Sequence, residues 1–135
     1  MSLFHRFFHN KDLNKLTLEN IEHAMVQNEF DRGLIRELII VFKKRVNQDG
    51  DERFRRWFSE LHYQLPKEFE SEAAAEQLYN MHSGWIESET KKLERETKLS
   101  WEEQTEDIKH LSVRARKAQL VVRHRLTDIY WDLLG

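Results

Sequence analysis

The sequence contains no cysteine, so it forms neither a disulfide framework nor a thiolate metal site. Proline occurs once and glycine four times in 135 residues, which is too little punctuation for the many turns of a β-sheet protein. No run approaches the ~20 consecutive apolar residues of a membrane-spanning helix, and residues 1–10 lack the apolar region of a signal peptide. These absences favour a soluble, unprocessed, cytoplasmic protein that does not contact a membrane.

Charge is abundant but unevenly distributed along the chain. Residues 1–56 hold 11 basic and 9 acidic side chains, residues 57–107 hold 5 and 13, and residues 108–135 hold 6 and 2. The acidic middle therefore has an electrostatic reason to lie beside the basic end, within one subunit or between two. The formal net charge of −2 argues against a protein devoted to polyanions.

Apolar residues recur at intervals of three and four through most of the chain, which predicts a series of amphipathic helices. Thr17 and Asp31 stand where N-caps are expected, directly before two such stripes. Residues 47–50 supply turn formers, and a third stripe must stop before Pro66. A helical composition then continues through residues 67–98.

The Ser83-Gly84 pair is the one weak place in that last stretch, because glycine inside a helix costs about 1 kcal/mol relative to alanine. The pair marks either a kink or a break. The segment Ser100-Trp101-Glu102-Glu103 matches the capping box. It predicts one helix from Ser100 to about Leu134, roughly 50 Å long and longer than a compact domain of this size is wide.

Two apolar stripes run along this predicted last helix. The first is typical of a core face and consists of Ile108, Leu111, Ala115, Ala118, Val122, Leu126, Ile129 and Leu133. The second lies about 180° away and consists of Val113, Leu120, Trp131 and Leu134. Either the helix passes through the centre of a bundle, or the second stripe contacts another subunit. The predicted length favours the second interpretation, so these four residues are the predicted oligomer interface.

The fold prediction is therefore all-α: an antiparallel helical bundle of about five helices with a long C-terminal helix, associating as a dimer. Residues 1–135 form a single helical domain in which residues 1–14 are an N-terminal aromatic arm. The arm is expected to fold back onto a groove of its own domain. The alternative is a short linear motif in which Leu3, Phe4, Phe7 and Phe8 bind a partner.

No motif in the sequence indicates catalysis, a cofactor or a metal. There is no Gly-x-Ser-x-Gly elbow, no glycine-rich phosphate loop and no Glu-x-x-His pair of the kind that builds di-iron bundles. Asp107 and Glu106 lie one helical turn before His110, but one such turn supplies only two ligands, and a structural zinc site needs four. We expect neither enzymatic activity nor a cofactor.

Basic side chains give nucleic-acid binding some support. Arg114, Lys117 and Arg125 share one face of the predicted last helix, and Arg53, Arg55 and Arg56 cluster near Trp57. Such residues neutralise phosphates by releasing counterions. The acidic segment, however, is able to neutralise them internally. The leading hypothesis is a non-enzymatic adaptor or regulatory protein acting as a homo-oligomer on a protein partner, and the alternative is a nucleic-acid-binding regulator.

Overall fold

The computed structural model describes residues 12–61 and 64–135, and this part of the chain is helical without a single strand. It contains the α-helices α2 (Leu18–Gln27), α3 (Arg32–Asp49), α4 (Asp51–Ser59), α5 (Glu72–Thr97), α6 (Trp101–Gln104) and α7 (Val113–Leu134). It also contains three 3-10 helices: η1 (Leu13–Lys15) before α2, η2 (Lys67–Phe69) between α4 and α5, and η3 (Glu106–Ile108) between α6 and α7. The predicted all-α class and long C-terminal helix are confirmed, with six α-helices in the described residues rather than about five. The antiparallel order of the bundle stays a prediction.

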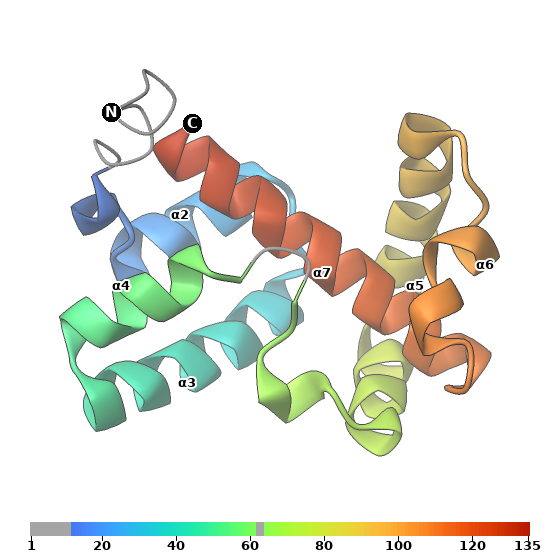
Figure 1. The fold of residues 1–135 in the computed structure, drawn as a ribbon, viewed down its shortest axis with the longest axis horizontal. Helices are drawn as coiled ribbons and strands as arrows, with labels where there is room; N and C mark the ends of the chain where they lie inside the picture. The colour runs from blue at the N-terminus through green and yellow to red at the C-terminus, as the bar shows by residue number, and fades with distance from the viewer. Residues whose placement is uncertain (1–11, 62–63) are drawn as a thin grey trace, which may run out of the picture.

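Helix α7 lies at the centre of the arrangement. Figure 1 shows α2, α3 and α4 around its C-terminal half, and α5 and α6 beside its N-terminal half. The most extensive helix contact is the one between α5 and α7, and α7 also packs against α2, α6 and η1. Since other helices cover α7 from more than one side, both of its apolar stripes have neighbours within the chain.

Local capping sets where several helices begin. Thr17 and Asp31 accept hydrogen bonds from backbone N–H groups three residues further on, and both predicted N-caps are thereby confirmed. Ser71 caps α5 in the same way. The predicted turn at residues 47–50 is shorter than expected, because α3 continues until Gly50, whose φ of 87° lies in the left-handed region that favours glycine.

Helix α5 is bent rather than broken. Its backbone leaves helical geometry at His82, where φ is −130° and ψ is 31°. The weak place predicted at Ser83-Gly84 is therefore a kink within one helix, and it lies one residue earlier.

The predicted single helix from Ser100 to Leu134 is wrong. The capping box at Ser100 is present, but the helix that it starts, α6, ends at Gln104. Ser112 then starts α7 by accepting a hydrogen bond from the backbone N–H of Ala115. With 22 residues, α7 is about 33 Å long. A rod too long for one domain therefore does not exist, and the argument from length for a second subunit falls with it.

The restart at Ser112 gives a first testable expectation. Ser112→Ala should lower the free energy of unfolding by about 1 kcal/mol, because the variant loses the cap of α7. Urea denaturation measures the loss, with Ser83→Ala as the matched control on the exposed surface of α5. A continuous helix would instead gain slightly from the serine-to-alanine change, so a more stable Ser112→Ala protein would contradict the observed break.

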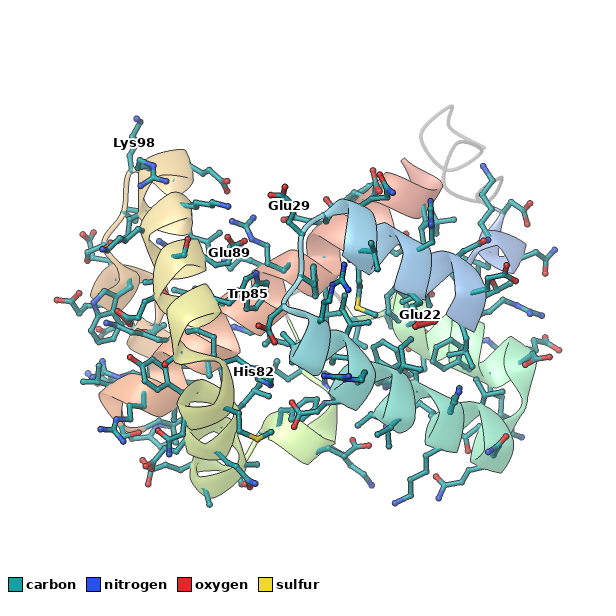
Figure 2. All side chains as sticks on the ribbon, turned by 180° about the vertical axis from the view of Figure 1, so that it is seen from behind. Glu22, Glu29, His82, Trp85, Glu89 and Lys98 are labelled. Carbon is teal, nitrogen blue, oxygen red and sulfur yellow. The ribbon has the colours of Figure 1, made fainter. Side chains whose placement is uncertain are left out.

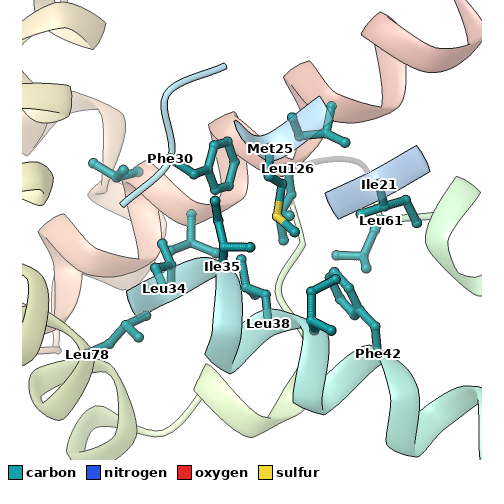
Figure 3. Close-up of a cluster of buried hydrophobic side chains, with 14 of the residues drawn as sticks. Ile21, Met25, Phe30, Leu34, Ile35, Leu38, Phe42, Leu61, Leu78 and Leu126 are labelled. Atoms are coloured by element: carbon teal, nitrogen blue, oxygen red, sulfur yellow. The ribbon is translucent and has the colours of Figure 1, made fainter. Parts of the chain in front are cut away.

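The core lies where α2, α3, α4 and α7 meet. Figure 3 shows side chains of α2, α3 and α7 converging, with Leu78 of α5 close to Leu34 of α3. Phe42 anchors the α3–α4 contact, since its ring centroid lies 5.8 Å from that of Phe54 and 5.6 Å from that of Phe58. Within the described residues, no helix combines the length and apolar character needed to cross a membrane.

Candidate interaction surface

The predicted interface stripe of α7 does not form a continuous surface. Val113 and Trp131 are 47% and 45% exposed, but Leu120 between them is fully buried in the chain's own core. Leu134 is half-buried against the same core. Leu120 is therefore unavailable to a second subunit in this conformation. Helix α7 instead passes through the centre of the bundle, which is the first of the two interpretations that its stripes allowed.

The basic side chains of α7 are largely neutralised within the fold. The Lys117 ammonium lies 2.9 Å from a carboxylate oxygen of Glu87, and the Arg125 guanidinium lies 2.8 Å from Glu89. Arg114 donates to the side-chain oxygen of Asn80 at 3.2 Å. The expected meeting of the acidic middle with the basic end thus occurs within one subunit, between α5 and α7. Two of the six predicted nucleic-acid contacts, Lys117 and Arg125, pair with carboxylates in this way, and Arg114 bonds to a neutral amide.

The three arginines of α4 lie apart from this α7 face. Arg56 pairs with Glu52 at 3.3 Å, Arg53 is exposed, and Arg55 lies beside a small pocket that also touches Leu16. The six cations predicted to contact nucleic acid therefore do not form one surface. The predicted arm residues lie outside the described residues: Leu3, Phe4, Phe7 and Phe8. The arm's predicted end at residue 14 falls inside η1, which packs against α4 and α7.

His82 links the kink of α5 to the start of α3. Its Nδ1 lies 2.8 Å from Asp31 Oδ2, and its Nε2 lies 2.8 Å from Glu37 Oε2. Both nitrogens of the ring thus lie within hydrogen-bond distance of a carboxylate. Gly33 makes this approach possible, because a Cβ at that position would lie 2.9 Å from the His82 ring. Figure 2 shows His82 on the side of α5 that faces α3.

A second contact from α5 fixes the turn between α2 and α3. The indole N–H of Trp85 donates to the backbone carbonyl of Glu29 at 3.0 Å, and its ring centroid lies 5.4 Å from that of Phe30. Glu29 itself has a positive φ of 60°. The turn that joins α2 to α3 is therefore held in one conformation by Trp85 and His82 together.

The remaining polar clusters have structural partners. No group of three or more histidine or acidic side chains within 12–61 and 64–135 is arranged to hold a metal ion. The two carboxylates considered with His110 form ion pairs instead: Glu106 with Lys109 at 3.1 Å, and Asp107 with Arg123 at 2.9 Å.

His124 provides a pH-dependent expectation. Burial lowers the pKa of His124 below its usual 6.5, and neighbouring Arg123 lowers it further. The folded protein therefore prefers the neutral ring, and the unfolded chain takes up a proton first as the pH falls through about 6.5. Stability contributed by the neutral ring is present above that pH and declines below it. His124→Gln should therefore lose less stability than wild type between pH 7 and pH 5 in parallel denaturant titrations, and equal losses would contradict this assignment.

A groove of about 650 Å³ lies between α2 and α3. Its apolar lining is Val26, Phe30 and Ile35, and Val26 is 52% exposed. Glu22 of α2 and Glu29 of the following turn, both labelled in Figure 2, are among its lining residues. Arg32 and Arg36 line it from α3. The groove is thus apolar along its floor, acidic along its α2 edge and basic along its α3 edge.

The basic edge of this groove continues along the exposed face of α3. Successive side chains of an α-helix are about 100° apart around its axis. On α3, four cations lie within one arc of about 120°, and Ile40, which is 68% exposed, lies among them. The cations are Arg32, Arg36, Lys43 and Lys44. None of the four forms an ion pair or a hydrogen bond through its side chain with another residue in the described part of the chain. We call these four cations and Ile40 the α3 basic face.

The sequence carried a signal for the α3 basic face, since the residues recur at intervals of three and four on the side opposite the apolar stripe. What it did not show was which cations are neutralised. That distinction depends on contacts between α5 and α7 that join residues 30 and 36 positions apart. In comparisons with known proteins, no family model, no curated protein and no solved structure matches this chain.

Proposed function

We propose that this protein is a non-enzymatic interaction protein that binds a segment of a protein partner in the groove between α2 and α3. The observation that supports it best is which basic side chains form ion pairs within the fold and which do not. Lys117 and Arg125 of α7 form ion pairs with carboxylates of α5, whereas Arg32 and Arg36 beside the groove form none with the described residues. An apolar lining next to unpaired charge is the usual character of a peptide-binding groove, and Val26 is the exposed part of that lining.

The rigidity of the groove supports the same proposal. The turn at its end is fixed by the hydrogen bond from Trp85 and by the 2.8 Å contact between His82 and Asp31. A preformed groove loses little conformational entropy when a partner binds, and affinity gains accordingly.

The other polar side chains in the interior serve the fold. Gln119 donates to the backbone carbonyls of Phe69 and Glu70 at 3.1 and 2.8 Å, and thereby ties η2 to α7. Glu89 is held between Arg125 and Lys92. Such partners favour a structural role for these groups over acid–base chemistry, which supports an interaction protein rather than an enzyme.

A display selection tests the proposed groove. Random peptides of about 16 residues, long enough for about four helical turns, are selected on the immobilised full chain. Selected peptides should bind at least about tenfold more weakly to Val26→Arg, which blocks the groove, and equally well to Met81→Arg. Both residues are exposed, so both variants should fold. The proposal fails if no selected peptide distinguishes the two variants.

Dimerisation remains a separate proposal. The apolar residues of α7 that are exposed to a second subunit are Val113 and Trp131, at opposite ends of the helix. Of the two, Trp131 offers the larger apolar surface. Sedimentation velocity of wild type and Trp131→Ala over a range of concentrations tests it. A dimer that Trp131→Ala dissociates supports the proposal, and a wild-type monomer at every concentration ends it.

A further inference from the structure

We infer that the segment bound in the groove is an acidic amphipathic helix, whose carboxylates lie against the α3 basic face. This inference rests on the proposed function and adds the chemical class of the partner. It is carried by three features of the same surface: the spacing of the unpaired cations, the apolar residues beside them, and the opposite charge of the α2 edge.

The spacing of the cations matches a helix lying along α3. Arg32 and Arg36 are one turn apart, and Lys43 follows two turns later. Along the helix axis these steps amount to about 6 Å and about 10 Å. A partner helix repeats its own side chains at the same intervals, so acidic residues at i, i+4 and i+11 meet the three cations in turn. The two guanidinium groups add bidentate hydrogen bonding to carboxylates.

Apolar residues accompany the cations over the same length. Val26, Phe30 and Ile35 line the groove beside Arg32 and Arg36, and Ile40, which is 68% exposed, lies among the cations of the α3 basic face. Isoleucine so exposed between cations gains nothing from a phosphate backbone but gains from burial under an apolar side chain. The surface therefore fits a partner that carries an apolar stripe beside its acidic one.

The negative charge of the α2 edge would repel a polyanion. Glu22 and Glu29 face the groove opposite Arg32 and Arg36, and neither carboxylate has an ion-pair partner in the described part of the chain. A nucleic acid carries negative charge on every side, so its phosphates would meet these carboxylates as well as the arginines. A helix with acidic residues on one flank and neutral or basic residues on the other satisfies both edges. Charge complementarity therefore favours the acidic helix over nucleic acid.

The peptides selected on wild type provide the test. Their sequences should be enriched in Asp and Glu spaced three or four residues apart, beside apolar residues of the same period. Arg32→Glu combined with Arg36→Glu should weaken their binding by at least about tenfold, while Lys91→Glu with Arg95→Glu should change it by less than about twofold. The control pair has the same spacing and charge change on the exposed surface of α5. Circular dichroism verifies that both double variants fold.

Each remaining outcome separates this inference from the proposed function. Some selected peptides could bind Val26→Arg more weakly and yet carry no acidic pattern, or bind both double variants equally. Either result overturns the inference and leaves the proposed function standing. Peptides whose binding is unchanged by Val26→Arg overturn both the inference and the proposed function. Duplex DNA or single-stranded RNA that binds wild type, loses affinity with the Arg32→Glu/Arg36→Glu variant and displaces the selected peptides would make this a nucleic-acid surface and also overturn the inference.

Discussion

Replacing Leu120 with glutamate will remove a large part of the stability of the fold and lower its melting temperature markedly. Leu120 is fully buried in the core and lies on the middle of α7, which helices cover from more than one side. A carboxylate there loses its hydration without gaining a partner, which costs at least about 4 kcal/mol. A domain of this size typically has only about 5–15 kcal/mol of stability to lose. Circular dichroism and thermal melting measure the effect.

Two further variants make this result specific. Leu120→Ala should keep the fold and lower the free energy of unfolding by about 3 kcal/mol, the usual effect of a cavity left by leucine. Val113→Glu, on the exposed first turn of α7, should change it by no more than about 0.5 kcal/mol. If Leu120→Glu instead remains folded and halves the sedimentation mass, Leu120 belongs to a subunit interface and its placement in the core is wrong.

His82→Leu should destabilise the protein by about 2 kcal/mol. The variant removes both short contacts that join α5 to the start of α3 and leaves the Asp31 and Glu37 carboxylates without their partner. The two carboxylates are about a third exposed, so water compensates part of the loss, and the full cost of a deeply buried pair does not apply. Urea denaturation at neutral pH measures the change.

The control for His82 is His23→Leu, because His23 lies on the exposed side of α2. It should leave stability within about 0.5 kcal/mol of wild type. Gly33→Ala offers an independent route to the same contact, since its methyl group would press against the His82 ring and displace it. Wild-type stability in both His82→Leu and Gly33→Ala would show that the contact holds nothing together.

Helix starts that depend on neighbouring residues were predictable from the sequence. Thr17, Asp31 and Ser100 cap helices as expected, because a cap involves only a side chain and a backbone N–H a few positions later. The end of a helix was harder to predict. After Gln104 the chain leaves helical geometry with no proline or glycine to signal it, and the backbone N–H of Ser112 bonds to Glu72, 40 residues away.

The candidate surface was predictable only in part. The first stripe is buried from Ala115 to Ile129, as predicted, but pattern alone does not show whether the second stripe is covered by its own chain or by another subunit. Leu120 is covered by its own chain. Nor does pattern alone reveal partners distant in sequence. His82 meets Asp31 and Glu37, 51 and 45 positions away, only because the kinked α5 packs beside α3.

The central claim, that a partner helix lies between α2 and α3 with its acids on the α3 basic face, is tested most directly by chemical-shift mapping. A peptide selected on wild type is titrated into ¹⁵N-labelled protein. We predict that the largest amide shifts fall within residues 22–44, with Val26, Ile35 and Ile40 among them, and that α7 stays largely unchanged. Shifts concentrated on Arg114, Lys117 and Arg125, or on Val113 and Trp131, would contradict it.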